Sequence, residues 1–397
     1  MLLRGFKALL LLILPFTTLL AQDTSMIKNT AQVLLDKKNE SGLSLGAYAQ
    51  LDYTQPLSSD KRYNGKMDIH RFVTFMGYKF NEKASFVSEI EIEHVKEVYI
   101  EQAFINYALF DQLNFKAGLI LIPMGIVNEY HEPPTFNGTL RPNLEKMIIP
   151  STWRELGTGF SGNLNKLSLR YQLYLVNGFA SYNKEAKLKG SDGLRGGRQK
   201  GSKAMISYPN LTGKVDYYGI HALKIGLSGY FGKTQSSLYD GISTSNKAAM
   251  ATADSSVVSI NMISVDARYK RNALQARAEY VFARLRNTSQ YNEFTSMDLG
   301  SGMAGYYIEV GYDVLNIFNN CKHEMILFGR YETYDTHYSV SQELAMNPAY
   351  DRNDVTIGVT YKLSPGLAIK ADYQIFSNAN GDDIPGQLNF GIGVWIY

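Results

Sequence analysis

The sequence has little cysteine, and its charge is not of one sign. Cys321 is the single cysteine among 397 residues, so neither an internal disulfide nor a thiolate metal cluster is possible. The 40 Lys and Arg residues face 37 Asp and Glu residues. This balance argues against nucleic acid or any strongly charged partner.

Long hydrophobic runs are also missing from most of the chain. The longest late stretch, around Leu119 to Val127, is broken by Pro123. A helix needs roughly 20 apolar residues to span a bilayer, so no spanning helix is expected there. If a chain without such a helix is secreted, it is either water-soluble or a membrane β-barrel.

The first residues differ from the rest and resemble a secretory signal peptide. Arg4 and Lys7 precede an apolar core at 8–20, and Ala21 offers a small residue for cleavage. A retained anchor is the alternative, but a core of 13 residues interrupted by Pro15 is short for a span. Cleavage after residue 21 would remove two bases and leave a net charge of 38 − 37 = +1.

What is abundant is alternation of apolar and polar residues, in about sixteen segments that continue to the last residue. Short and long connections follow one another, as in outer-membrane barrels with short periplasmic turns and long outer loops. The 28 Tyr and 19 Phe residues would supply aromatic girdles. The pattern predicts an all-β transmembrane antiparallel β-barrel at 43–397, after a signal peptide at 1–21 and a periplasmic lead-in at 22–42. The strands are expected near 43–54, 66–80, 84–94, 98–109, 113–122, 156–164, 166–178, 202–217, 221–233, 256–270, 273–286, 303–316, 322–335, 353–363, 366–378 and 386–397.

The alternation also assigns the two faces of the clearer strands. A charged side chain facing lipid at mid-membrane costs roughly 2–4 kcal/mol, so the charged face must be the lumen. Strands 66–80 and 98–109 do not resolve in this way. In the strands that do, inward bases do not outnumber inward acids, which predicts weak ion selectivity. The predicted pore-lining residues are Lys116, Arg170, Asp266, Arg268, Arg277, Glu279, Arg330, Glu332, Lys370 and Asp372.

The longest connection, 123–155, is the third outer loop and holds five prolines and an apolar patch at 147–149. An uncovered apolar loop is unexpected in water, so we expect it to fold inward and narrow the pore. A lid packed outside the barrel is the alternative. The charged side chains expected to contact solutes are Arg141, Lys146, Arg154, Glu129, Glu132, Glu145 and Glu155.

Catalytic and metal-binding signals are weak. His131 lies beside Glu132 and near Glu129, which suggests a polar loop contact more than a metal site. The one match to G-x-S-x-G, GLSLG at 42–46, lies at the start of a predicted strand and not in a strand-to-helix turn, although a catalytic group assembled from distant residues stays open. We therefore expect no enzyme activity, no metal and no cofactor.

The third loop and its exit strand resemble a known family. RPNLEKMIIPSTWRELGTGFSG (141–162), with NEYHEPPTFNG before it and LNFKAGLILIPMG (113–125), is similar to the phosphate-selective porin O and P family of Gram-negative outer membranes. The resemblance implies a sixteen-stranded barrel, usually a homotrimer, whose third loop enters the lumen. It also implies a basic pore for phosphate, from which the balanced strand charges depart.

Together these observations predict a Gram-negative outer-membrane porin for passive diffusion of small hydrophilic solutes. An anion- or phosphate-selective channel of the same fold is the first alternative. A barrel enzyme and an adhesin remain as less favoured alternatives.

Overall fold

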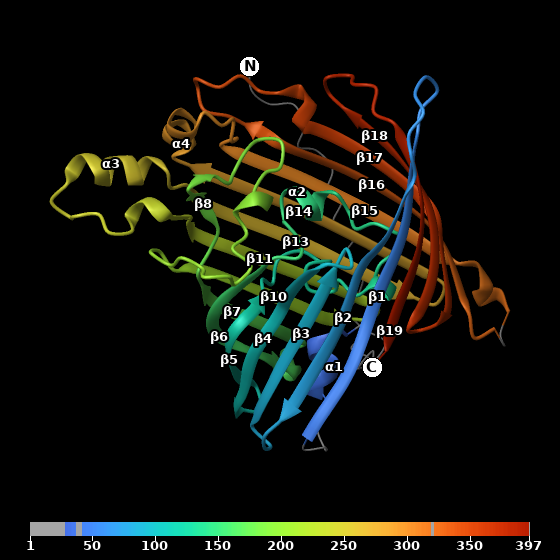
Figure 1. Ribbon diagram of the computed structural model, residues 1–397. Coiled ribbons are helices and arrows are strands. Elements are labelled where there is room, and N and C mark those ends of the chain that lie inside the picture. Colours follow the sequence, from blue (N-terminus) through green and yellow to red (C-terminus); the bar gives the residue numbers. More distant parts are fainter. Residues whose placement is uncertain (1–27, 37–41, 319–320, 397) are drawn as a thin grey trace.

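In the computed structural model, which describes residues 28–36, 42–318 and 321–396, sixteen antiparallel strands close into one barrel (Figure 1). Neighbouring strands in the chain are neighbours in the wall, and β1 closes the barrel against β19. The wall strands are β1 (Gly42–Leu57), β2 (Lys66–Lys79), β3 (Ala84–Glu93), β4 (Glu97–Phe110), β5 (Leu113–Leu121), β6 (Arg154–Leu164), β7 (Leu169–Val176), β10 (Asn210–Ile220), β11 (Leu223–Lys233), β13 (Ser259–Arg271), β14 (Leu274–Arg286), β15 (Gly302–Asp313), β16 (Glu324–Ser339), β17 (Asp351–Ser364), β18 (Leu367–Asn378) and β19 (Gly386–Ile396).

The predicted fold class, strand number and strand order are confirmed. Several predicted strand ends differ by a few residues, and three of these differences have a local reason. β10 begins at Asn210, directly after Pro209, because proline cannot donate to the strand ladder. β7 begins at Leu169 because residues 165–167 form a 3-10 turn that closes with Ser168 at φ 53°. β15 ends at Asp313, whose carboxylate accepts a hydrogen bond from the Leu315 N–H and starts another 3-10 turn.

Alternation along each strand separates a lipid-facing surface from the lumen. In β7 and β18 the outward Leu173, Leu175, Ile369 and Ile375 are each about half exposed, whereas the residues between them are buried or half-buried. An apolar outer face and a polar inner face are what a barrel in a bilayer requires.

Short and long connections lie at opposite ends of the barrel, with a few exceptions. Short turns lie at one end of the barrel, except that 314–323 between β15 and β16 is longer. The loops at the other end hold a small sheet of β8 (Ala180–Asn183), β9 (Glu185–Ala186) and β12 (Gln235–Ser236) and the helices α3 (Lys247–Ser255) and α4 (Thr288–Thr295) (Figure 1). The sequence pattern did not predict this sheet, because its strands are too short to show alternation.

Part of the lead-in forms a short helix, α1 (Thr30–Asp36), inside the barrel (Figure 1). It packs on the inner faces of β2 and β3, with the Leu34 side chain against Gly77. The inner face of β2 is therefore apolar at Val73 and Phe75, which explains why its alternation did not resolve. Residues 1–27 and 37–41, including the predicted signal peptide, lie outside the described residues. In the described part of the chain no helix is long and apolar enough to cross a membrane.

The orientation in the membrane is a testable expectation. In a Cys321→Ser background, cysteines at the exposed Ser245 and Ala345 should react in intact cells with a membrane-impermeant maleimide. Cysteines at the exposed turn residues Glu82 and Pro365 should react only after the outer membrane is opened. The reverse pattern of labelling would show that the long loops face the periplasm.

Candidate functional site: the loop folded into the barrel lumen

The third loop, residues 122–153, connects β5 to β6 and lies inside the barrel (Figure 1). All of residues 122–139 are buried, and the loop carries a 3-10 turn at Pro133–Thr135 and one helical turn, α2 (Leu144–Met147). In the apolar patch, Ile148 and Ile149 are fully buried and Met147 is half-buried. The inward path is thus confirmed, and a lid outside the barrel is excluded.

The base of the loop is closed by one asparagine. The Asn128 side-chain amide donates to the carbonyl oxygens of Ile122 (2.7 Å) and Trp153 (3.1 Å), and its Oδ1 accepts from the Trp153 N–H (2.7 Å). The Trp153 ring stacks on Phe179 with a centroid separation of 4.5 Å. These contacts join the two ends of the loop independently of its middle.

The middle of the loop is held by wall charges that bind its backbone. Lys370 Nζ donates to three loop carbonyl oxygens, those of Pro133 (2.7 Å), Phe136 (2.6 Å) and Gly138 (2.8 Å). Asp372 accepts from the Thr139 N–H at 2.6 Å. Hydrogen bonds to charged groups are the stronger kind, so these contacts fix the path of the loop across the lumen.

Charged side chains of other wall strands and of the loop itself also bind the loop backbone. Lys214 Nζ donates to the Gly125 carbonyl oxygen at 2.6 Å, and Glu332 accepts from the Leu144 N–H at 3.0 Å. Glu145 of the loop accepts from the N–H groups of Val127 (2.7 Å) and Asn128 (3.1 Å). Burial raises the pKa of Glu145 against the opposing effect of these bonds.

Most acidic residues of the predicted constriction form hydrogen bonds or ion pairs that hold the loop in place. Glu129 accepts from Gln172 at 2.6 Å and pairs with Lys214 at 3.2 Å, while Glu155 accepts from the Trp153 indole N–H at 2.8 Å. Glu132 accepts from the N–H (2.5 Å) and hydroxyl (2.7 Å) of Thr30, which ties the loop to α1.

The three predicted bases of the constriction differ in exposure. Arg154 is buried beneath Tyr99, whereas Arg141 is half-buried and Lys146 is exposed. Arg141 and Lys146 are therefore the members of the predicted set that keep contact with solvent. Burial is the main cause that lowers the pKa of Arg141 to about 10.

The predicted pore-lining residues all lie on the inner wall, where most join ion pairs. Arg330 pairs with Glu332 (3.3 Å) and Glu309 (3.4 Å), and Arg268 pairs with Asp266 at 3.5 Å. Glu279 accepts from the Ile126 N–H of the loop at 3.3 Å. Lys116 lies over the Phe104 ring, 4.8 Å from its centroid.

Loop residue Tyr130 stands among three wall cations. Its hydroxyl accepts hydrogen bonds from Arg170 Nη1 (3.0 Å) and Lys224 Nζ (3.2 Å), and the Arg268 guanidinium lies 4.6 Å from its ring centroid. Burial opposes ionisation of the phenol, but Lys224, Arg170 and Arg268 outweigh it and lower the pKa of Tyr130 to about 7.

Sequence patterns missed several charged lumen residues. Arg71, Glu101, Lys214 and Asp216 are buried inside the barrel on strands whose alternation was masked. In β4 a β-bulge opposite Glu89 and Ile90 leaves Glu101 unpaired in the ladder, so Glu101 and Gln102 are both buried. A bulge breaks the two-residue period, and no period-based pattern can locate the side chain that it redirects.

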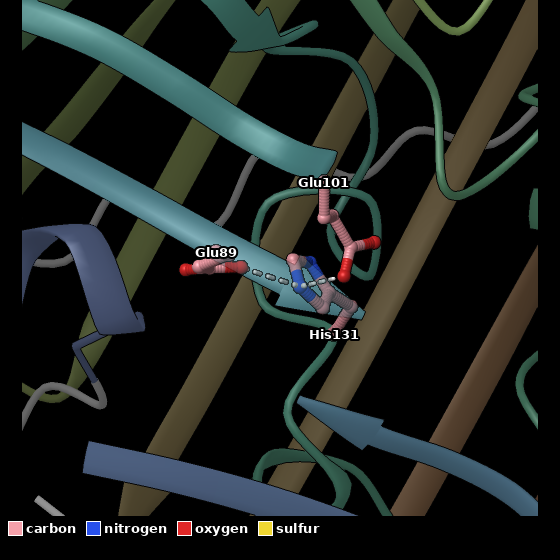
Figure 2. Close-up of side chains that lie close together, drawn as sticks. All are labelled: Glu89, Glu101 and His131. Atoms are coloured by element: carbon pink, nitrogen blue, oxygen red, sulfur yellow. Dashed lines mark ion pairs between the residues drawn. The ribbon is translucent and has the colours of Figure 1, made fainter. Parts of the chain in front are cut away.

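The bulge brings Glu101 to a buried histidine of the loop (Figure 2). His131 Nε2 lies 3.6 Å from Glu101 Oε2, 3.7 Å from Glu89 Oε2 and 2.9 Å from the Tyr48 hydroxyl. Burial opposes protonation of His131, but Glu101 and Glu89 outweigh it and raise the pKa of His131 to about 9. The sequence placed His131 near Glu129 and Glu132, whereas the structure turns those two carboxylates toward other partners.

The connection 179–201 carries six bases and two acids and contacts the end of the third loop. Arg195 donates to the Ser151 carbonyl oxygen at 2.8 Å, and Arg198 donates to the carbonyl oxygens of Pro150 (3.2 Å) and Thr152 (3.3 Å). Burial is the main cause that lowers the pKa of Arg198 to about 9. These bases are thus committed to backbone contacts inside the protein.

Comparison with known proteins places the chain in a family. An uncharacterised protein of Aquifex aeolicus (strain VF5) is 33% identical over 341 residues, which cover 84% of this chain and 75% of the relative. The chain belongs to the same family as this Aquifex protein. No established family model matches the chain, so the likeness to phosphate-selective porins stays an expectation for this Aquifex family.

Solved structures share the fold at low sequence identity. The anion-selective porin of Comamonas acidovorans has a TM-score of 0.56 at 12% identity and covers 90% of this chain and 99% of its own. The trimer form of OmpT, an outer membrane protein of Vibrio cholerae, gives 0.54 at 12%, covering 89% and 100%. The outer membrane channel DcaP of Acinetobacter baumannii gives 0.53 at 11%, covering 89% and 96%. These likenesses show that this chain has the fold of outer-membrane porins.

Proposed function

We propose that this protein is an outer-membrane porin through which small hydrophilic solutes diffuse passively. The observation that carries the proposal is a closed barrel with an apolar outer face, a charged inner wall and a long loop bound across the lumen. Reconstitution into a planar bilayer tests it. Stepwise single-channel currents are expected, and a folded protein that produces none would leave the adhesin or enzyme alternative.

A second candidate, an anion-preferring channel, is favoured by which charges meet water. Arg170, Arg268, Arg277 and Lys362, here called the basic belt, keep 13–19% of their side-chain surface exposed. They all lie near the short-turn end of the lumen. The acids that pair with the first three, Glu129, Asp216, Asp266 and Glu309, are at most 4% exposed. Glu324 is the exception, with 38% exposed at the rim between Lys270 and Lys362.

Because the bases are more exposed than the acids, an equal number of each does not make the pore neutral to a passing ion. Buried acids hold the belt in place, while the side-chain surface presented to a passing ion is mainly basic. A pore wall of one sign favours counter-ions, and phosphate is among the anions such a wall would accept. The likeness to phosphate-selective porins agrees with this candidate. A homotrimer is the assembly we propose with it.

The belt makes a specific prediction for selectivity. We expect wild-type channels to prefer anions in low salt, and the triple change Arg170→Gln, Arg268→Gln, Arg277→Gln to move the reversal potential toward cations. The effect should shrink near 0.15 M salt, where the screening length is about 8 Å. Reversal potentials across a salt gradient measure it.

The matched control removes the same number of positive charges from three exposed loop residues. Changing Lys61, Arg62 and Lys247 to Gln should leave the reversal potential nearly unchanged, because these side chains are exposed on the outer loops. Equal effects of both triple variants would exclude the belt as the source of selectivity. A wild-type reversal potential near zero would exclude the anion-preferring channel and leave the general porin.

A further inference from the structure

The buried group of Glu89, Glu101 and His131 joins the third loop to the barrel wall (Figure 2). Glu89 and Glu101 come from β3 and β4, and His131 comes from the loop. All three are at most 1% exposed, and one candidate ligand atom of each lies within 4.8 Å of the other two. From this geometry we propose that Glu89, Glu101 and His131 bind one first-row divalent transition-metal ion, such as zinc, which clamps the loop to the wall.

The spacing of the donor atoms fits a metal better than it fits hydrogen bonds. Separations of 3.6 and 3.7 Å from His131 Nε2 to the two carboxylate oxygens are too long for hydrogen bonds. Ligands bonded to zinc at about 2.1 Å in a tetrahedron stand about 3.4 Å from one another. Small side-chain movements therefore suffice to form the site. The Tyr48 hydroxyl, 2.9 Å from Nε2, stands beside the position the ion would take.

An unsatisfied carboxylate oxygen is the second observation. Glu89 Oε1 accepts from Gln102 at 2.7 Å, but Oε2, which faces His131, has no hydrogen-bond partner among the described residues. A buried carboxylate oxygen without a partner is costly, and a bound cation would remove that cost.

The other nitrogen of the imidazole is held as in a metal-ligating histidine. His131 Nδ1 lies 3.2 Å from the Asn128 carbonyl oxygen, and this contact assigns the proton to Nδ1. In the absence of an ion, Nε2 donates to the Tyr48 hydroxyl, which itself donates to Glu101 Oε2 at 2.9 Å. A metal ion would replace the proton on Nε2, as metal binding at a histidine requires. A ligating histidine commonly donates its second N–H to a backbone carbonyl in this way.

The surrounding charges leave room for a cation. Arg71 pairs with Glu91 at 3.3 Å, and Arg141 donates to the His131 carbonyl oxygen at 3.2 Å. The charges that act on the site are those of the acids Glu89, Glu91, Glu101 and Glu132 and of the bases Arg71, Arg141 and Arg154. When a bound ion replaces the imidazole proton, these acids exceed the bases by one, so the pocket around the ion is net negative.

Zinc titration of the full mature protein in detergent micelles, after treatment with a chelator, tests the proposal. Calorimetry should show one saturable site per chain. Losing even an outer partner of a metal site costs about 10- to 100-fold in affinity, so Glu89→Gln, Glu101→Gln and His131→Gln should each weaken binding at least about tenfold. Cobalt(II) should give a visible d–d absorption that these changes abolish.

The surface pair His94–Asp68 provides the matched control, because an exposed histidine beside a carboxylate can also collect zinc. His94→Gln should leave the buried site intact. The isosteric Glu101→Gln keeps the test valid if His131→Gln fails to fold. Equal zinc binding by wild type and Glu101→Gln, loss of binding in His94→Gln, or no binding by folded wild type would each overturn the proposal. None of these readouts depends on channel activity.

Discussion

Replacing residues 129–149 with a short Gly/Ser linker is expected to raise single-channel conductance several-fold. The segment crosses the lumen and is almost entirely buried, so its removal widens the narrowest part of the path. The barrel should still form, because the strand ladder is independent of the loop and Asn128 still joins the loop ends. Wall charges such as Lys370 and Asp372 would then be hydrated.

Planar-bilayer recording measures this effect, with heat-modifiable gel migration as the check of folding. Deleting 243–250 is the control, because that segment includes the first turn of α3, which extends away from the wall (Figure 1). The control should keep wild-type conductance. Unchanged conductance in a folded 129–149 deletion would mean that the open path lies elsewhere in the lumen.

Changing Lys370 to Met is expected to loosen the same loop without removing it. Methionine keeps the apolar stem but loses three hydrogen bonds, which leaves the carbonyl oxygens of Pro133, Phe136 and Gly138 without their shared donor. Hydrogen bonds to charged groups contribute about 1.5–3 kcal/mol each, so a loss of about 3 kcal/mol in docking free energy is a cautious figure. That corresponds to an approximately hundredfold rise in the undocked population.

Rapid flicker between two conductance levels should report the undocked loop. Proteolysis between 129 and 149, followed by mass spectrometry, should report it independently. Lys166→Met is the matched control, because Lys166 is exposed in a short turn outside the loop's contacts. Quiet wild-type currents and resistance to protease in Lys370→Met would show that the remaining anchors are sufficient.

The sequence by itself determined the barrel. A two-residue period places every second side chain in lipid, and lipid excludes charge, so strands such as β7 and β18 could be oriented without a structure. The length of the third loop and its apolar patch at 147–149 likewise required burial against something. Neither inference needed to know which residues meet.

Only the tertiary structure decided how the lumen is filled. Helix α1 packs on the inner face of β2, where Val73 and Phe75 are buried, so both faces of β2 carry apolar residues and alternation cannot orient it. The bulge in β4 redirected Glu101. Which charges are exposed also depends on contacts between distant strands, which explains why counting bases and acids did not reveal the basic belt. The pairing of His131 with Glu89 and Glu101 has the same origin. Closing the barrel and folding the loop bring together residues that no sequence spacing relates.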